Sequence, residues 1–260
     1  MVEKRVSIMK IAIITIAGVS SRFNEGIDED KKVLKCLYTE NSKENTLLYN
    51  LMKNCTFADL IILVGGYKFG DLSCFYKNEL SEEFPDVVLV ENEHYSDLGS
   101  GYSLYLGLKE AFEHNPTEIL FVEGDLDIDS ESFKRVAEAK NSVLTYTNEP
   151  IYSNKAVVLY KDDKNRYRYA FNSSHGLMTI DSPFSCILNS GQTWKFTEMD
   201  KLKSANKKFF ETAKADTNLR IIQNYLDMGV DVDIILLKRW TNCNTRYDYK
   251  KILTYWEEEK

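Results

Sequence analysis

The chain has 260 residues, of which 43% are hydrophobic and 28% charged, and its formal net charge is −7. This size and composition are typical of a soluble globular protein with a full core. The acidic balance argues against a partner that is duplex nucleic acid, and no run approaches the ~20 apolar residues needed to cross a membrane.

The first predicted element is a buried strand over residues 11–16, which ends in a turn of small residues. Its apolar, mostly β-branched side chains favour a central strand that is covered on both faces. Ala17 and Gly18 then leave backbone amides free to face a ligand, and Val19, Ser20 and Ser21 continue the turn.

Two basic residues, Arg22 and Lys32, follow this turn. Bare amides offer partial positive charge to phosphate oxygens, and the two side chains add full charges that match the negative charge developing in phosphoryl chemistry. The segment therefore predicts an anion site. The alternative is an ordinary strand end, because the spacing fits neither a dinucleotide-binding motif nor a P-loop.

Strands and helices then alternate. We predict a short strand over 34–38, a helix over 46–53, a strand over 59–67 that ends in glycines, a helix over 69–80, a strand over 86–92, a helix over 102–111 and a strand over 118–129. Gly65 leaves room for a ligand at a strand end, and Ser100 or Ser103 lies at a helix entry. This alternation predicts a three-layer α/β/α fold with a mostly parallel, mixed sheet.

The pattern changes beyond residue 142. We predict strands over 143–146 and 156–160, a hairpin tip at 161–165 leading to 167–169, a less regular segment over 182–191, helices over 201–214 and 217–228, a strand over 233–237 and a helix over 247–258. These β elements are expected to extend the same sheet. Without internal repeats or a linker rich in Pro, Gly and Ser, the chain is interpreted as a single domain over residues 9–260.

Carboxylates gather where the strand after residue 118 ends, at Asp125, Asp127 and Asp129. Alternation along an extended chain would point Asp125 and Asp127 to the same side. Converging carboxylates suit Mg²⁺, which shares its other ligands with substrate phosphates. A solvated acidic turn that caps the helix over 130–140 is an equally weighted alternative. Because neighbouring strand ends share one crevice, we expect the basic turn to face Asp125, as in a nucleoside triphosphate site.

The cysteines are widely spaced and odd in number, with no C-x-x-C pair to suggest zinc or a redox centre. They are Cys36, Cys55, Cys74, Cys186 and Cys243. Free thiols in a reducing cytoplasm are the simplest interpretation. Lys10 interrupts the apolar run near the start of the chain, so a cytoplasmic rather than a secreted protein is expected.

The opening motif resembles that of the sugar-phosphate nucleotidylyltransferases. Their pattern of a strand, G-x-x-S-R-[LMF] and then P-K-x-L is met by Gly18-Val19-Ser20-Ser21-Arg22-Phe23 and by Lys32-Val33-Leu34. Short matches continue over nearly the whole chain, at 62–67, Asn92 with Tyr95, 103–106, 123–125, 190–191 and 247–249. Within the family, the chain looks most like the choline-phosphate cytidylyltransferases of bacterial surface-polysaccharide pathways.

The resemblance implies a Rossmann-like nucleotidyltransferase fold, similar to GT-A, with a nucleotide-binding half over 9–141 and an acceptor-binding half over 142–260. It implies that Ala17 and Gly18 hold the nucleotide through backbone amides and that Arg22 and Lys32 contact the triphosphate. By the same likeness, the remaining turn residues and Gly65 belong to the nucleotide site, Ser103 lies near the base, and Asp125 binds Mg²⁺.

Two departures from the family pattern affect this site. Lys31 stands where the family prefers proline, and Asn244 stands where many members have a second metal-binding aspartate. Asn244 is therefore predicted at the metal site with Asp125 and Asp127, carrying an amide instead of a carboxylate. A catalytically weakened member is one consequence that the sequence leaves open.

The predicted reaction is attack by the phosphate or phosphonate of a small acceptor on the α-phosphorus of an NTP, with CTP favoured, and release of pyrophosphate. His175 is a predicted acceptor contact, and Trp194 could join other aromatic residues in a box for a quaternary ammonium such as choline. Core packing is the alternative for these rings. Phosphocholine, a phosphonate and a sugar phosphate all remain open as acceptors, and a homodimer is compatible with this interpretation.

Two other functions also fit the motifs. A metal-dependent nucleotide-sugar glycosyltransferase uses a D-x-D at a strand end as well, but it has no need of Arg22 and Lys32 in the first loop. A non-catalytic nucleotide-binding protein would bind CTP without releasing pyrophosphate.

Overall fold

The computed structural model describes residues 8–153, 156–171, 173–174 and 177–258. Within these residues, one sheet contains nine strands. They are β1 (Lys10–Ile16), β2 (Leu60–Gly65), β3 (Val87–Glu91), β4 (Glu118–Glu123), β6 (Ser142–Thr147), β7 (Val158–Asp162), β8 (Tyr167–Tyr169), β11 (Phe184–Phe196) and β12 (Val232–Leu236).

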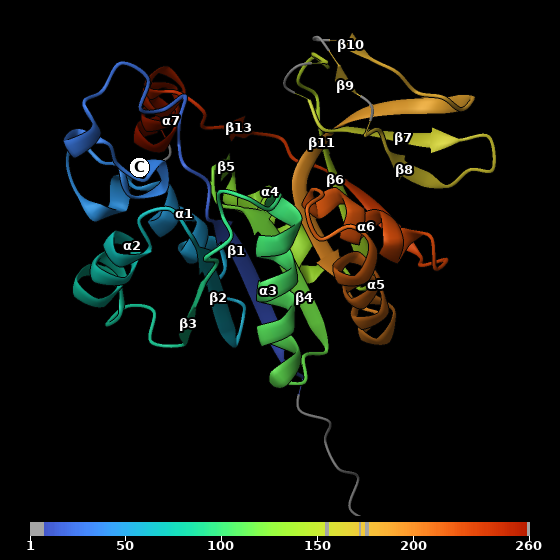
Figure 1. The fold of residues 1–260 in the computed structure, drawn as a ribbon, viewed down its shortest axis with the longest axis horizontal. Helices are drawn as coiled ribbons and strands as arrows, with labels where there is room; N and C mark the ends of the chain where they lie inside the picture. The colour runs from blue at the N-terminus through green and yellow to red at the C-terminus, as the bar shows by residue number, and fades with distance from the viewer. Residues whose placement is uncertain (1–7, 154–155, 172, 175–176, 259–260) are drawn as a thin grey trace, which may run out of the picture.

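The strand order is β12-β6-β11-β4-β1-β2-β3, and β7 joins β11 on one side and β8 on the other (Figure 1). Strands β4, β1, β2 and β3 are mutually parallel, as are β12 and β6. The antiparallel pairs in the described part of the sheet are those of β11 with β4, β6 and β7, and that of β7 with β8. The predicted mostly parallel, mixed sheet is confirmed, and it runs through both predicted halves.

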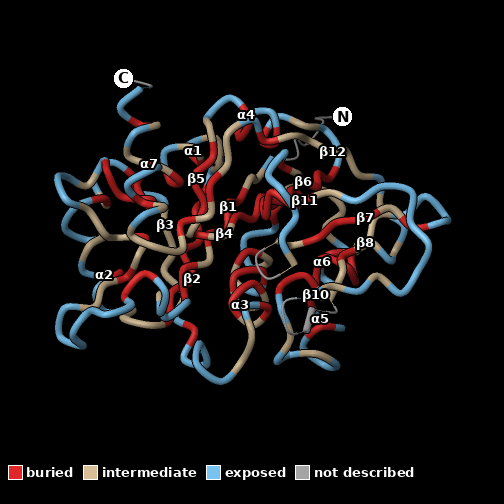
Figure 2. The backbone as a smooth tube through the Cα atoms, turned by 90° about the horizontal axis from the view of Figure 1, so that it is seen from above, coloured by how far each residue is buried: buried red, intermediate tan, exposed pale blue. Residues whose placement is uncertain are grey.

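Helices cover both faces of the sheet, which confirms the predicted three layers. The helices are α1 (Leu47–Asn54), α2 (Phe69–Phe75), α3 (Ser100–Glu113), α4 (Ser130–Glu138), α5 (Met199–Thr212), α6 (Asn218–Leu226) and α7 (Arg246–Glu258). One hydrophobic cluster joins α1, α2, α4 and α7 to the sheet, and a second joins α3, α5 and α6 to the other face. Figure 2 shows the buried strands between these two helix sets.

Strand β1 explains why the two faces form. Ala12, Ile14 and Ile16 pack in one cluster, whereas Ile11 and Ile13 pack in the other. Successive side chains of a strand point to opposite faces, so an unbroken apolar run supplies both cores. The predicted central strand covered on both faces is therefore confirmed.

Small elements complete the chain. Two short antiparallel pairs join β5 (Leu126–Ile128) to β13 (Trp240–Asn242) and β9 (Ser173–Ser174) to β10 (Leu177–Met178). Short 3₁₀ turns lie at Glu29–Lys31, Lys35–Leu37 and Lys43–Asn45, and a π-helical turn at Tyr76–Leu80 extends α2. The predicted helix over 69–80 is thus a helix with an irregular second half.

The single strand predicted over 118–129 is divided into β4 and β5, and two other predictions of local structure are also wrong. The segment over 34–38, predicted as a strand, is a 3₁₀ turn, because its backbone has no strand beside it and is fixed by the loop after β1. The segment over 182–191, predicted as irregular, belongs to the 13-residue strand β11. This strand owes its length to pairing with β4, β6 and β7, which lie far away in sequence.

Two further sequence-based expectations concern the whole chain. None of the helices in the described part of the chain combines the length and apolar character needed to cross a membrane. All five cysteines are free thiols, as predicted, and Cys36, Cys55 and Cys243 are buried.

Candidate functional site

The turn after β1 is fixed by hydrogen bonds to the segment after residue 32. The buried Asn24 side chain donates to the Val33 carbonyl oxygen at 2.8 Å and accepts from the Val33 amide at 3.1 Å. Ser20 Oγ accepts from the Lys35 amide at 3.3 Å. Ser20 has a φ of 56°, a left-handed conformation that costs a non-glycine residue roughly 1–2 kcal/mol. These contacts hold Lys35 beside the turn.

A cavity of about 240 Å³ opens at the carboxyl ends of β1 and β4. Its walls come from the turn after β1, the 3₁₀ turn at Lys35, the loop into α3 and the end of β4. The residues that line it include Ala17, Gly18, Ser20, Lys35, Cys36, Asn92, Tyr95, Gly99, Ser100, Ser103, Glu123, Gly124 and Asp125. The glycine turn and the aspartate after β4 therefore share one cavity, as the sheet topology predicted.

Gly18 and Gly124 contribute to this cavity in different ways. A Cβ added to Gly18 would have no atom within 4 Å, so this residue borders open space. A Cβ added to Gly124 would lie 2.0 Å from Ile16 Cγ2 and 2.9 Å from the Thr15 carbonyl oxygen. Gly124 is thus required for the close approach of β4 to β1, whereas Gly18 leaves space that a ligand can fill.

Asp125 is held by a basic residue of the same cavity. Lys35 Nζ lies 2.7 Å from Asp125 Oδ2, and both side chains are about one-fifth exposed. The Asp125 carbonyl oxygen accepts from the Cys243 amide at 2.7 Å. Asp125 Oδ1 is buried and has no hydrogen-bond partner among the described residues. This oxygen and the cavity beside it fit a hard divalent cation that is shared with phosphate oxygens.

Arg22 and Asn244 meet beside this site. Arg22 Nη2 donates to Asn244 Oδ1 at 2.8 Å, although 222 residues separate them in sequence. Asp248 Oδ2 accepts from the Asn244 amide at 3.0 Å. Asn244 follows Cys243, whose amide contacts Asp125, so the Arg22 guanidinium is tethered close to the aspartate.

Lys32, Val19 and Ser21 lie elsewhere. They line a separate depression together with Tyr67 and Glu29. Lys32 Nζ lies 2.5 Å from Glu29 Oε2, and this hydrogen bond raises the pKa of Lys32. The structure therefore does not bring Lys32 to Asp125, because its side chain pairs with the acidic turn that precedes it.

The predicted base contact lies in the cavity wall. The buried Ser103 Oγ accepts from Asn92 Nδ2 at 2.9 Å, and Asn92 Oδ1 accepts from the His94 amide at 2.9 Å. Gly65, by contrast, does not line the cavity: a Cβ added there would lie 2.7 Å from the Leu72 side chain. The Gly65 carbonyl oxygen accepts from the Asn92 amide at 2.8 Å, so Gly65 helps to position Asn92, which lines the cavity.

Glu123 places a second carboxyl group in the cavity. Asn218 Nδ2 donates to Glu123 Oε1 at 2.7 Å. Ser100 Oγ in turn contacts Asn218 Oδ1 at 3.2 Å and accepts from the Asn218 amide at 3.3 Å. Burial, and then the nearby charge of Asp125, raise the pKa of Glu123 to about 8, because both disfavour its ionised form.

Asp127 does not join Asp125. It is buried, forms an ion pair with Arg239 and accepts from Trp256 Nε1 at 2.8 Å. Strand β4 ends at Glu123 and the chain turns before β5, so the alternation of one extended strand does not relate these aspartates. Within the described residues, no group of three or more His, Cys, Asp or Glu side chains could hold a metal ion by itself.

Trp194 and His175 are the two predicted acceptor contacts. Trp194 is fully buried, stacks on Phe121 with ring centroids 5.0 Å apart and donates to the Tyr169 hydroxyl at 2.6 Å. It is a core residue and does not line the cavity, which corrects its assignment as an acceptor contact. His175 lies outside the described residues.

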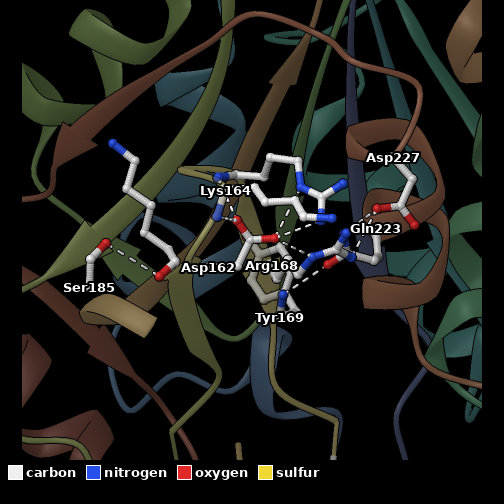
Figure 3. A network of polar contacts seen from close by, with 9 residues as sticks. Asp162, Lys164, Arg168, Tyr169, Ser185, Gln223 and Asp227 are labelled. Carbon is white, nitrogen blue, oxygen red and sulfur yellow. Dashed lines mark hydrogen bonds and ion pairs between the residues drawn. The ribbon is translucent and has the colours of Figure 1, made fainter. Parts of the chain in front are cut away.

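A polar network anchors the hairpin of β7 and β8 to α6 (Figure 3). Burial disfavours ionisation of Asp162, but donors that include Arg168 Nε at 3.0 Å hold the pKa of this carboxyl below its usual range. Arg168 Nη1 also lies 3.1 Å from Oδ1 of Asp227, the residue directly after α6. Gln223 Oε1 accepts from the Tyr169 amide at 2.9 Å. The hairpin is thereby fixed to the helix that carries Asn218.

Sequence reasoning missed Lys35, Glu123 and Asn218. Lys35 had a detectable signal, because Lys35-Cys36-Leu37 repeats the K-x-L spacing of Lys32-Val33-Leu34 directly after it. Glu123 stands two residues before Asp125 and was visible as an acidic neighbour. Asn218 had no local signal, since only the packing of α6 brings it to β4.

Comparisons with known proteins place this geometry in context. A family model described as a domain of unknown function (DUF6564) matches residues 31–256. No curated protein matches the sequence. Solved structures resemble this fold over nearly its full length.

Three such structures are similar to this chain. An inositol-1-phosphate CTP transferase from T. maritima is 18% identical with a TM-score of 0.66, covering 94% of this chain and 95% of that chain. A CTP:phosphocholine cytidylyltransferase from Streptococcus pneumoniae is 18% identical with a TM-score of 0.64, covering 96% and 100%. A putative glucose-1-phosphate thymidylyltransferase from Bacillus anthracis is 17% identical with a TM-score of 0.67, covering 95% and 94%. These likenesses confirm the predicted nucleotidyltransferase-like fold.

Proposed function

The chain belongs to the family described as a domain of unknown function (DUF6564), and we propose that it is a nucleotidyltransferase. In the proposed reaction, a phosphate oxygen of a small acceptor attacks the α-phosphorus of an NTP. A new phosphorus–oxygen bond forms, the bond between the α- and β-phosphates breaks, and pyrophosphate leaves. No covalent intermediate on a side chain is needed.

One observation carries this proposal: the Gly18 turn, Lys35 and Asp125 line the same cavity at adjacent strand ends. Open space above Gly18 admits a ligand next to backbone amides, and Lys35 brings a positive charge to within 2.7 Å of the Asp125 carboxylate. A cavity that combines amide donors, a cation and a carboxylate suits a polyphosphate with its metal ion.

The residues of this site would act by alignment and by charge neutralisation. Lys35 and Arg22 would stabilise the negative charge on the α-phosphate and on the leaving pyrophosphate. We assign the central role to Lys35 rather than to Lys32, because Lys32 pairs with Glu29 outside the cavity. The amides of Ala17 and Gly18 would hold the nucleotide, and Ser103 would lie by the base.

Mg²⁺ is the proposed cofactor, and Asp125 would hold it. The buried and unpartnered Oδ1 of this residue is the observation that the metal ion fits. A magnesium ion bound there would neutralise phosphate charge and polarise the α-phosphorus for attack. Lys35 keeps the other carboxylate oxygen in place, so the aspartate is already oriented before the nucleotide arrives.

CTP is the proposed nucleotide, supported by the likeness to two structures whose names include CTP. For the acceptor, the second half offers one relevant contact. Arg220 already lies over the Phe171 ring, with 4.1 Å between its Cζ and the ring centroid. Arg220 thus already occupies one face of the Phe171 ring, and Trp194 is fully buried, so neither ring supports an aromatic box, and we favour a sugar or polyol phosphate over phosphocholine as the acceptor.

The glycosyltransferase alternative loses support from the structure. Its D-x-D would need Asp127 beside the metal, but Asp127 is engaged by Arg239 and Trp256. A non-catalytic nucleotide-binding protein remains the second candidate, because Asn244 brings no carboxylate to the site and instead binds Arg22.

The test begins with thermal shifts of the protein with each of the four NTPs and Mg²⁺. Pyrophosphate release is then measured with the stabilising NTP and inositol 1-phosphate, glucose 1-phosphate or phosphocholine. Release that depends on both NTP and acceptor supports the proposal. Stabilisation by CTP without pyrophosphate from any acceptor would support the non-catalytic alternative, and the absence of both responses would refute the nucleotide site.

A further inference from the structure

The cavity that contains Asp125 is also lined by a second carboxyl group, that of Glu123. We propose that Glu123 and Asp125 hold the divalent cation together and that Asn218 positions Glu123 for this task. The inference rests on the proposed function, since the cation is the one that accompanies the nucleoside triphosphate. It assigns to Glu123 a role as metal ligand and to Asn218 a role as positioning residue.

The Glu123 carboxylate is oriented by the helix layer. One of its oxygens, Oε1, accepts from Asn218 Nδ2 at 2.7 Å. Ser100 at the start of α3 holds Asn218 through both its amide and its side chain. Glu123 itself lines the cavity, so its second oxygen is left for a ligand. A ligating carboxylate whose other oxygen is hydrogen-bonded is the usual arrangement around metal ions.

Asp125 is prepared in the complementary way. Its Oδ2 accepts from Lys35 Nζ, whereas its buried Oδ1 has no partner among the described residues. Glu123 and Asp125 flank Gly124 and line the same cavity. Each carboxylate thus has one oxygen held by the protein and one oxygen available to a cation.

The charges explain why one carboxylate is insufficient. Lys35 balances the negative charge of Asp125, so this pair alone attracts a divalent cation only weakly. The other acidic or amide candidates are engaged: Asp127 by Arg239 and Trp256, and the Asn244 amide oxygen by Arg22. Among the described residues that line the cavity, Glu123 is the remaining carboxyl group, and it supplies the missing negative charge once the incoming cation displaces its proton.

The experiment measures binding of Mn²⁺, a paramagnetic substitute for Mg²⁺, to the full chain saturated with CTP and without acceptor. Free Mn²⁺ is quantified by electron paramagnetic resonance, so the readout does not depend on turnover. Glu123→Gln preserves the size of the side chain and removes its charge. We expect its Kd for Mn²⁺ to rise about 10-fold or more, as for Asp125→Asn, and that of Asn218→Ala to rise by a smaller factor.

Glu91→Gln is the matched control, because Glu91 is an exposed residue at the end of β3 and does not line the cavity. Its Kd should stay within about twofold of that of the unaltered protein. A Glu123→Gln variant that binds Mn²⁺ as tightly as the control, while Asp125→Asn does not, would overturn the inference. If Glu123→Gln fails to fold, unchanged Mn²⁺ binding by Asn218→Ala overturns it instead.

The two proposals fail in different ways. Pyrophosphate release by the unaltered protein, together with Mn²⁺ binding that is independent of Glu123, would leave the nucleotidyltransferase standing and remove the second ligand. If no NTP binds, the proposed function fails, and Mn²⁺ binding measured without nucleotide still decides whether Glu123 and Asp125 act as a pair.

Discussion

Replacement of Lys35 by methionine is the sharpest test of the proposed site. The change keeps most of the aliphatic stem and removes the ammonium group that lies 2.7 Å from Asp125 Oδ2. Lys32→Met is the informative partner, because Lys32 is only three residues away, follows the same K-x-L spacing and pairs with Glu29 instead. The two variants therefore distinguish the lysine that lines the cavity, Lys35, from the lysine that the family motif indicates, Lys32.

The structure sets the expected sizes of the effects. Loss of one preorganised charge at a developing phosphate anion lowers kcat by about 10²- to 10³-fold, or roughly 3–4 kcal/mol. The Lys35–Asp125 pair is about one-fifth exposed, so its loss should destabilise the fold by only about 1–3 kcal/mol. Lys35→Met should therefore remain folded while losing turnover. Lys32→Met should lose less than about 10-fold, since its charge lies outside the cavity.

The assay is pyrophosphate release at saturating CTP and acceptor, with thermal unfolding as a check on folding. Lys31→Met controls for the loss of one charge, because Lys31 is exposed and pairs with Asp28 on the surface. Equal losses in Lys35→Met and Lys32→Met would show that both lysines reach the triphosphate. Full turnover in Lys35→Met, with a large loss in Lys32→Met, would refute the assignment made here.

Three further results are expected. Gly18→Ala should keep the fold, since its new Cβ meets no atom within 4 Å, but should abolish the thermal stabilisation by CTP; retained stabilisation would argue against a nucleotide above Gly18. Gly124→Ala should instead lower the free energy of unfolding by about 1–3 kcal/mol, measured in urea, because its Cβ would overlap Ile16. Lys195→Met should cost about 3 kcal/mol, because the buried Lys195 Nζ lies 2.7 Å from Glu118 Oε2. Burial opposes ionisation of Glu118, but Lys195 and Lys10 hold its pKa below the ordinary 4.5. The stabilisation from this ion pair is therefore present above pH 4.5 and is lost as the pH falls below it. The free energy of unfolding of Lys195→Met should decline less steeply below pH 4.5 than that of the unaltered protein.

The fold was predictable because its signals are local and regular. The apolar run of β1 and the glycine-ended run of β2 each indicate a buried parallel strand, and the alternation with helices fixes the layers. Strand β11 escaped because its outer half, over 184–188, is largely exposed and carries no clean alternation. Its pairing with β7 makes this outer half a strand, and a single sequence does not display such long-range pairing.

The site was predictable in outline and not in detail. Gly18 and Asp125 could be expected in one crevice because parallel strand ends meet at one edge of a sheet. The choice between Lys32 and Lys35 depends on a turn of irregular structure, whose register is set by the Asn24 side chain. The direction of the Asp127 side chain depends on where β4 ends, and strand ends are the least certain part of a prediction from sequence.

The turn after β1 depends on the other end of the chain for its shape. Arg246, the first residue of α7, packs against two rings, with its Cζ 4.4 Å from the Phe23 centroid and 3.6 Å from the Tyr38 centroid. Its Nε also donates to the Phe23 carbonyl oxygen at 3.3 Å, next to the Arg22–Asn244 hydrogen bond. Because these contacts fix both sides of Arg22, the segment before α7 sets where this cation stands relative to the cavity. Asn244 therefore has a physical role without a carboxylate: its neutral amide oxygen orients Arg22, whereas a charged group there would neutralise it.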